Sequence, residues 1–477
     1  MEPRPKQPSL AGWLPTLLSG AVVRALAALR LFVFAPLLGP EGFGLLRIAQ
    51  SAMQILTSVG ALGMPQAYPR FFPELEDAAA RRAFWLHTMA WSCVGIVVLT
   101  ALLAAMPSVA AELLFNDVKH RWLALGLAAM LPASWLLRSM IGAAQGLGKF
   151  RDAAVGETIQ SVGFFGAGLA LLYVFPGRVL PLLLAFAAAM ALGGAYLLAR
   201  SGLMRSPVGT PAAADITRRA VRYAAWYMLI PVTNTLFELI DRWMVSRALS
   251  MATAGAYSFI PLLGLGMFLF GASLGAVALR TATRMQLDQG RAAAERYVWS
   301  CVKIVFLASL AYSVAMRLAE PLVWRIFGPE WSRAALLLPY FLCYYALFNV
   351  AWLVATFAAL REAAWIQLAA GVLGTAANAA LNAALIPEWG VLGAAAGTVA
   401  GQALLLAAHV AYSARAGVVS TRSGAATLAL PLLMLAPVWL QGVALAALSW
   451  AAWRGWYLDR EARAMLGDYA RRMLARR

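Results

Sequence analysis

Charged residues are scarce in this sequence. Only 13% of its 477 residues are Asp, Glu, Lys or Arg, whereas 62% are hydrophobic, and the mean hydropathy is +0.72. An ordinary soluble domain carries roughly twice this charged fraction, so a soluble globular protein is excluded. The apolar runs are continuous, whereas the strands of a membrane β-barrel alternate over about 10 residues. The composition therefore predicts an all-α polytopic membrane protein.

Cysteine and histidine are equally rare, with three of each. Cys93, Cys301 and Cys343 each lie inside an apolar run, and the histidines are far apart, so neither a disulfide framework nor a metal site is expected. The glycine-rich phosphate-binding loop that ends in Gly-Lys followed by Ser or Thr is also missing, which argues against ATP hydrolysis. The net charge of +18 comes from cations at the ends of apolar runs. We therefore expect no nucleic-acid partner and no cofactor.

Long apolar stretches bounded by charges, proline or glycine predict the membrane spans. A span needs about 20 apolar residues, and a polar linker at 201–218 separates two groups of six. The stretch 424–457 is long enough for two further short helices, broken at Pro431, Pro437 or the Gln441-Gly442 step. The prediction is fourteen spans, with twelve as the alternative. The first twelve lie near 12–38, 43–64, 83–106, 121–143, 153–175, 179–199, 221–249, 254–280, 297–318, 333–359, 364–386 and 390–413.

Positive charges divide the loops between these spans into two alternating sets. One set holds most of the arginines, including Arg81 and Arg82. The linker and a basic tail at 459–477 belong to this set. The opposite set mixes few cations with several acids. By the positive-inside rule the first set is cytoplasmic. The sequence thus predicts a multi-pass membrane protein with both termini in the cytoplasm, which requires an even number of spans.

The two halves of the chain repeat one another. Leu38 to Gly44 separates spans one and two in the way that Leu249 to Tyr257 separates spans seven and eight. Because each half has six spans, both halves keep one orientation, and we expect a pseudo-two-fold axis along the membrane normal with a cavity at the centre. The predicted parts are a six-helix lobe at 1–200, the linker, a six-helix lobe at 219–415, two additional helices at 416–458 and the tail.

Charged side chains inside the predicted spans are the candidates for substrate binding, because a charge near the bilayer centre costs at least a few kcal/mol. Arg24 and Arg30 lie in span one, about 120° apart around the helix. Span seven carries a polar stripe at i, i+4 and i+7 with an arginine beside it. The members of this group are Asn234, Glu238, Asp241 and Arg242.

Two interpretations of these charges stay open. Arg242 can be neutralised by Glu238 on its own helix, and the repeat register places Asp241 opposite Arg30, so these residues can form structural ion pairs. Arg24 has no acidic neighbour within a helical turn, which favours contact with an anion. Arginine binds phosphate through paired hydrogen bonds, so a phosphate-bearing lipid head group fits this site. We assign Arg24, Arg30, Arg242 and Asn234 to substrate binding, and Glu238 and Asp241 to coupling or gating.

Four further polar residues are weaker candidates for the cavity. Arg47 and Arg138 lie nearer the ends of spans two and four, where an arginine often extends toward the membrane surface. Asn378 and Asn382 are spaced i, i+4 on span eleven, a pattern more typical of hydrogen bonds between helices than of ligand contact.

Several stretches resemble a known family. Arg30 to Gly44 and Gly63 to Arg70 look like the opening of polysaccharide-biosynthesis flippases, the O-antigen and exopolysaccharide repeat-unit translocases of the multidrug/oligosaccharidyl-lipid/polysaccharide exporter superfamily. Asp241-Arg242-Trp243 before Ala254 to Ser258 is similar to the family's seventh and eighth spans. The segment from Leu381 to Ala395 is similar to the hairpin of spans eleven and twelve.

This resemblance implies a two-lobed fold, a cationic cavity and alternating access, with an undecaprenyl-pyrophosphate-linked oligosaccharide as the cargo. Arg24 and Arg30 match cavity arginines of the family, and Asp241 with Arg242 matches its charged pair in the seventh span. The implied partners are the lipid-linked glycan, the bilayer and the machinery that polymerises the polysaccharide. We expect a monomer in a bacterial inner (cytoplasmic) membrane that is not an enzyme and is driven by a proton or sodium gradient.

Other functions remain as alternatives. A drug or metabolite exporter of the same superfamily would favour an acidic cavity over one lined by arginine. A membrane polymerase or ligase would need a long outward loop with carboxylates or histidines, and the outward segments around 107–121 and 318–333 are short. A membrane scaffold without transport is a further alternative.

Overall fold

The computed structural model describes residues 10–457 apart from 76, 206–213, 333, 362, 364, 419 and 456, with most side chains described from Leu29 onward. This part of the chain forms helices and no strand, which confirms the predicted all-α membrane fold. Nine of the described helices are long and apolar enough to cross a membrane. The choice between fourteen and twelve spans stays a prediction. The middle of the predicted linker and the basic tail at 459–477 lie outside the described residues.

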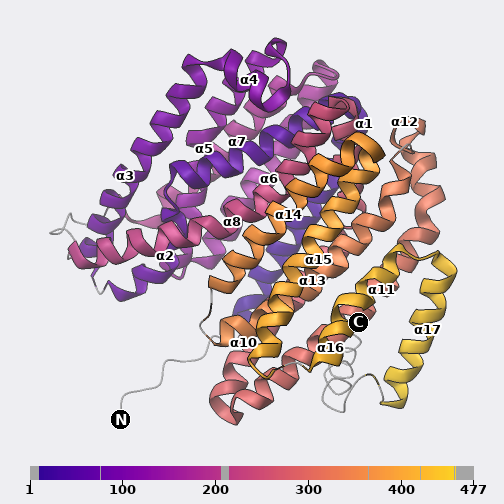
Figure 1. Cartoon of the computed structure of the whole chain (residues 1–477). Coiled ribbons are helices and arrows are strands. Elements are labelled where there is room, and N and C mark those ends of the chain that lie inside the picture. The colour runs from indigo at the N-terminus through magenta and orange to yellow at the C-terminus, as the bar shows by residue number, and fades with distance from the viewer. Residues whose placement is uncertain are drawn as a thin grey trace, which may run out of the picture. The chain divides into compact units, whose positions relative to one another are not determined.

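The first compact unit extends to Gly255 (Figure 1). It contains two short 3-10 turns, η1 (Phe72–Glu74) and η2 (Val118–His120). Its last helix, α8, packs against α1 and α2, so the predicted linker at 201–218 lies within this unit. The helices of the unit are α1 (Leu10–Gly60), α2 (Met64–Phe71), α3 (Ala78–Ala105), α4 (Pro107–Phe115), α5 (Arg121–Gly146), α6 (Phe150–Val174), α7 (Val179–Ser201) and α8 (Ala214–Ala248).

The second compact unit begins at Ala256, inside α9 (Met251–Leu263). Its main packing pairs are α14 with α15 and α10 with α11. The remaining elements are α10 (Leu265–Gln289), α11 (Arg291–Phe327), α12 (Pro329–Ser332), η3 (Ala335–Leu337), α13 (Leu338–Leu360), α14 (Trp365–Trp389), α15 (Val391–Arg415), α16 (Thr421–Ala429), η4 (Leu430–Leu435) and α17 (Val438–Arg454).

The helices follow the predicted spans closely, with differences where glycine and proline interrupt them. α1 joins predicted spans one and two through Gly39, whose φ of 68° breaks the helix. The predicted span 254–280 is two helices separated at Gly264. Near the C-terminus the break falls between Leu430 and Pro437, whereas the Gln441-Gly442 step lies inside α17. The short helices α2 and α4 were not expected.

The short helices α2 and α4 mark the two ends of the first unit, which we call the α2 end and the α4 end. α3 runs from one to the other (Figure 1). At the α2 end the backbone of α2 lies directly on α5, because a side chain at Gly146 would come within 2.5 Å of the Tyr68 carbonyl oxygen. At the α4 end, Trp243 of α8 donates a hydrogen bond of 2.7 Å to the Leu113 carbonyl.

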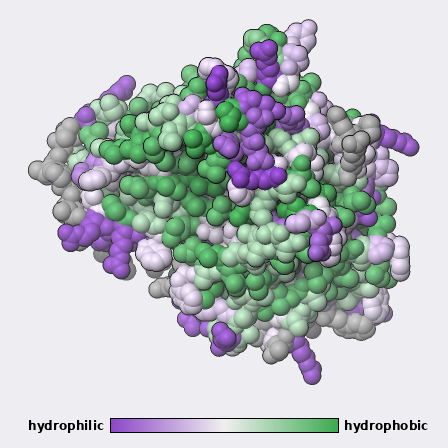
Figure 2. Space-filling model, turned by 45° about the horizontal axis from the view of Figure 1, so that its top comes forward, coloured by the Kyte–Doolittle hydropathy of each residue, from purple (hydrophilic) through white to green (hydrophobic). Residues whose placement is uncertain are grey.

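Apolar side chains cover much of the outer surface, as expected of helices that face lipid. Figure 2 shows a face on which hydrophobic residues spread over the helices while hydrophilic residues gather in separate patches. α3 is the clearest case, since only 17% of the residues in its most apolar stretch are buried. Trp91, Val94 and Val97 on this helix are each close to 60% exposed. We conclude that α3 presents this side to the bilayer.

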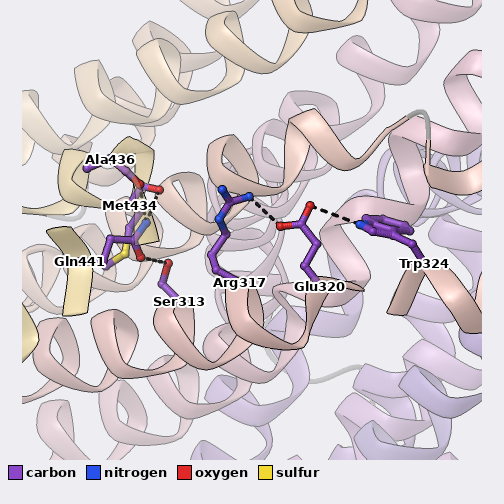
Figure 3. A network of polar contacts seen from close by, with 7 residues as sticks. All are labelled: Ser313, Arg317, Glu320, Trp324, Met434, Ala436 and Gln441. Carbon is purple, nitrogen blue, oxygen red and sulfur yellow. Dashed lines mark hydrogen bonds and ion pairs between the residues drawn. The ribbon is translucent and has the colours of Figure 1, made fainter. Parts of the chain in front are cut away.

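Buried polar contacts attach η4 and α17 to α11 in the second unit (Figure 3). The Gln441 side chain is fully buried and accepts a hydrogen bond of 2.7 Å from the Ser313 hydroxyl. Its amide nitrogen donates to the carbonyls of Met434 and Ala436, each at 2.9 Å. Gln441 therefore satisfies two carbonyls that the break between η4 and α17 leaves without helical partners.

Replacing Gln441 with leucine is expected to lower the free energy of unfolding by about 2 kcal/mol, because buried polar groups without partners each cost about 1–3 kcal/mol. The measurement is denaturant unfolding of the purified protein in detergent. Gln289→Leu, at an exposed end of α10, is the control and should unfold like the parent protein. Equal stability of Gln441→Leu and the parent would show that these contacts contribute nothing.

Candidate functional site

A cavity of about 710 Å³ lies inside the first compact unit. Helices α1, α2, α5, α6, α7 and α8 all contribute to its wall. The wall mixes polar and apolar side chains, whereas the outer surface of the unit is largely apolar. The lining residues are Arg30, Arg47, Gln50, Met53, Gln54, Pro65, Gln66, Pro69, Ser134, Leu137, Arg138, Ile141, Gly142, Gln145, Glu157, Gln160, Phe186, Met190, Tyr223 and Tyr227.

The position of α2 in the cavity wall depends on a glycine of α5. A Cβ atom at Gly142 would collide with the carbonyl oxygen of Pro65. Because glycine carries no side chain, the two backbones approach each other closely. This approach places Gln66 and Pro69 on the cavity wall beside Gln145 of α5.

Three arginines and one glutamate give the cavity wall an excess of positive charge. Glu41, two residues after Gly39, lies near Lys119 of η2 at the α4 end. Arg30 and Arg47 are nine and eight residues from Gly39, which places both about 12–14 Å from the α4 end at 1.5 Å per residue. Arg138 and Glu157 lie eight residues before the end of α5 and seven after the start of α6, so they are nearer the α2 end. Arg47 also donates a hydrogen bond of 3.2 Å to Gln50.

Arg30 combines burial with an unsatisfied hydrogen-bond donor. Its side chain is only 8% exposed, and its Nε atom has no hydrogen-bond partner within the described part of the chain. The guanidinium lies over the ring of Phe164 at 4.6 Å and near that of Phe186 at 5.8 Å. Contact with an aromatic face stabilises a cation by about 0.5–2 kcal/mol, less than the several kcal/mol that burial of a charge costs. The site therefore favours an anion.

The polar stripe of α8 has a different environment. The Arg242 side chain is buried, donates to the Ser51 hydroxyl at 2.8 Å and pairs with Glu238 at 3.0 Å. Asp241 is buried, and Asn234 is exposed. None of these four residues is among those that line the cavity, so their assignment to binding or coupling stays a prediction.

The other predicted residues fall into three groups. Arg47 and Arg138 share the cavity with Arg30, although their positions near span ends suggested weaker candidates. Asn378 and Asn382 belong to the second unit, where both are fully buried; Asn378 lies against Gly401 of α15, as a residue at a helix contact would. The side chain of Arg24 lies outside the described residues.

Sequence reasoning missed the glutamines and tyrosines of the cavity. Their spacing carried a signal, because Arg47, Gln50 and Gln54 follow one another at i, i+3 and i+7, which is one helix face. Tyr223 and Tyr227 are likewise at i, i+4 on α8. The candidates for substrate binding were chosen mainly by their charge. A stripe of neutral polar residues in an apolar span is equally informative about a cavity.

The chemistry of the cavity is that of binding. Guanidinium groups donate hydrogen bonds to anionic oxygens, and each glutamine amide supplies a donor and an acceptor. Among the described residues no three His, Cys, Asp or Glu side chains lie together as a metal site would require. The wall thus suits a ligand that carries both negative charge and hydroxyl groups.

Comparison with known proteins gives one family and several similar structures. The family model described as polysaccharide biosynthesis protein matches residues 9–278. No curated protein sequence matches the chain. Among solved structures, the lipid II flippase MurJ in an inward closed conformation superposes with a TM-score of 0.72 at 12% identity, covering 92% of this chain and 98% of that one.

Two other similar structures are transporters. An inward-facing multidrug resistance MATE family transporter of the MOP superfamily has a TM-score of 0.69 at 13% identity, covering 84% of this chain and 98% of that one. A MOP superfamily transporter from Pyrococcus furiosus, described as having a binding pocket of reverse polarity, has a TM-score of 0.60 at 14% identity, with coverages of 87% and 94%. At these identities the similarity establishes the fold.

Proposed function

The chain belongs to the polysaccharide biosynthesis protein family, and we propose that it is a flippase for a polyprenyl-pyrophosphate-linked oligosaccharide repeat unit. It moves this unit from the cytoplasmic to the periplasmic leaflet of a bacterial inner membrane by alternating access. The unit is then available to the machinery that polymerises a surface polysaccharide such as O-antigen or exopolysaccharide. The similar fold of the lipid II flippase supports the flipping of a lipid-linked substrate.

The observation that carries this proposal is the buried Arg30 guanidinium, whose Nε lacks a hydrogen-bond partner in the described part of the cavity. A pyrophosphate supplies negative oxygens that arginine binds in a charge-assisted manner. Arg47 and Arg138 add positive charge to the same wall, against the single carboxylate of Glu157. A cationic drug would be repelled by this balance, which disfavours the exporter alternative.

The size of the site fits a head group. Ligand pockets for small molecules measure about 300–1,000 Å³, and this cavity is about 710 Å³. In the proposed orientation the α2 end faces the cytoplasm and the α4 end faces the periplasm. The prenyl chain stays in the lipid while the pyrophosphate and the sugars enter the polar cavity.

A proton or sodium gradient is the proposed energy source, because a ligand changes a conformational equilibrium only through a difference in affinity between the two states. The Glu238 carboxylate is half exposed and pairs with the buried Arg242. Protonation of Glu238 would remove its negative charge and release the Arg242 guanidinium. Asp241 beside it is a second candidate for this role.

The test uses the purified protein in liposomes that contain undecaprenyl-pyrophosphoryl-N-acetylglucosamine in both leaflets. A galactosyltransferase added outside labels only the head groups of the outer leaflet. With the protein present, labelling is expected to continue until the inner-leaflet population is also consumed. A proton or sodium gradient across the membrane is expected to change the rate.

Protein-free liposomes are the control, and labelling there should stop at the outer-leaflet fraction. The same plateau in liposomes that contain folded protein, with and without either gradient, would refute the proposed function. An equal rate for a lipid that lacks the pyrophosphate would refute the role assigned to the arginines.

A further inference from the structure

The α2 end of the cavity carries, besides Arg138 and Glu157, uncharged groups that suit a sugar. Tyr223 and Tyr227 of α8 are stacked, with ring centroids 4.2 Å apart and an interplanar angle of 22°. Both rings line the cavity together with Gln66 and Gln145. Arg30 and Arg47, in contrast, are nearer the α4 end. The α2 end therefore adds an aromatic and amide surface to the cavity, beside the charged pair Arg138 and Glu157.

The tyrosine pair is held in place by a cluster at the edge of the cavity. The Phe71 ring meets the Tyr223 ring edge-on at 5.6 Å. The guanidinium groups of Arg70 and Arg219 both lie over the Phe71 ring, at 5.4 and 5.7 Å from its centroid, and both pair with Glu74. These contacts distinguish Tyr223 from an interfacial anchor, which would point its ring toward lipid head groups.

The outer ring of the pair is available to a ligand. Tyr227 is 41% exposed, and only one of its two faces is covered by Tyr223. The C–H face of a pyranose ring is apolar and carries slightly positive hydrogens, which complement the negative face of an aromatic ring. A flat sugar ring can therefore stack on Tyr227 without losing the solvation of its hydroxyl groups.

Gln66 supplies an independent indication of a hydroxyl-bearing ligand. This side chain lines the cavity, and its Oε1 atom is buried without a hydrogen-bond partner in the described structure. A buried acceptor without a donor is costly. A sugar hydroxyl is a donor of the right kind, and glutamine matches hydroxyl groups because it both donates and accepts.

We propose that Gln66, Tyr223 and Tyr227 form a subsite for a neutral hexose or N-acetylhexosamine of the transported glycan. This inference rests on the proposed function. The sugar ring stacks on Tyr227, and one of its hydroxyls donates to Gln66. Recognition of the glycan is thereby separated from recognition of the pyrophosphate within one cavity, so the tyrosines and the glutamine contribute to sugar specificity.

The experiment compares two ligands that differ only in the sugar, undecaprenyl pyrophosphate and undecaprenyl-pyrophosphoryl-N-acetylglucosamine. Their affinities for the full-length protein in detergent are measured by calorimetric titration. Tyr227→Ala and Gln66→Leu are each expected to weaken binding of the sugar-bearing lipid about tenfold, by loss of stacking or of a hydrogen bond. Binding of the sugar-free lipid should not change.

Two further variants make the result specific. Tyr227→Phe keeps the ring and is expected to bind the sugar-bearing lipid within about twofold of the parent protein, since the stacking face is unchanged. Tyr173→Ala removes a tyrosine that is 90% exposed at the end of α6 and serves as the matched control. If Tyr227→Ala does not fold, Gln66→Leu tests the subsite independently.

The outcomes separate this inference from the proposed function. Equal weakening of both lipids, or no change for either, would overturn the sugar subsite while leaving the flippase proposal intact. Failure of the parent protein to bind either lipid would instead overturn the proposed function, and the subsite with it.

Discussion

Glutamine in place of Arg30 is expected to weaken binding of undecaprenyl pyrophosphate about ten- to hundredfold, since a hydrogen bond to a charged group contributes about 1.5–3 kcal/mol. Translocation of the lipid-linked sugar should fall by at least the same factor. Glutamine keeps a polar group but is shorter and uncharged, so the loss reports on the guanidinium group as a whole. Calorimetric titration and the liposome assay measure the two effects.

The stability of this variant distinguishes the two roles considered for Arg30. If Arg30 were one partner of a buried ion pair with Asp241, its removal would leave a buried carboxylate alone and lower stability by about 3–5 kcal/mol. An anion-binding arginine that is buried without a partner for its Nε predicts the opposite, namely unchanged or higher stability in the absence of ligand. Thermal unfolding without lipid measures this difference.

Two variants accompany Arg30→Gln. Arg178→Gln removes an exposed arginine between α6 and α7 and should bind and transport like the parent protein. Arg30→Lys keeps the charge but loses the planar donor fork, so an intermediate affinity is expected. Normal pyrophosphate affinity of Arg30→Gln would contradict the proposal that this guanidinium binds the substrate.

Valine in place of Gly255 is expected to prevent folding of the first unit. A Cβ atom at Gly255 would collide with the carbonyl oxygen of Pro40 and lie 3.0 Å from the Gly44 nitrogen. These are backbone atoms, so no rotation of a neighbouring side chain relieves the collision, and a packed interior does not yield to it. We expect little or no monodisperse protein after detergent extraction, measured by size-exclusion chromatography.

Gly166→Val is the matched control, because a Cβ atom at that helical glycine of α6 would meet no heavy atom within 4 Å. It should give a normal yield. Gly44→Ala is expected to be intermediate, because its Cβ atom would lie 2.7 Å from the Met251 carbonyl oxygen. A normal yield of folded Gly255→Val would show that α1 and α9 separate at low cost.

The pairing of Gly44 with Gly255 shows how the sequence can indicate a contact without defining it. Both residues lie in the two segments that the repeat makes equivalent, Leu38 to Gly44 and Leu249 to Tyr257. Their direct packing against one another depends on how the two helical turns meet. Similarly, the sequence located the interruption near Pro437 but not the role of Gln441, since its partner Ser313 lies on α11, 128 residues earlier in the sequence.

The candidate site shows the same division. Charge within an apolar run identified Arg30 and Arg242 equally, and only the packing of α1 and α8 separates them. Arg30 faces a cavity, whereas Arg242 is satisfied by Ser51 and Glu238. Arg138 was a weak candidate because it lies near a span end, yet the approach of α2 to α5 at Gly142 includes it in the cavity wall.

The sequence alone determined that the chain is a helical multi-pass membrane protein and where most of its helices lie. This information is local, because each helix satisfies its own backbone and needs about 20 apolar residues to span a bilayer. Only the tertiary structure decided which polar residues share a cavity, which are neutralised by neighbours and which glycines allow backbones to touch. Those outcomes depend on how each helix is rotated about its axis and which helices it contacts. The hydropathy of a single helix does not specify either.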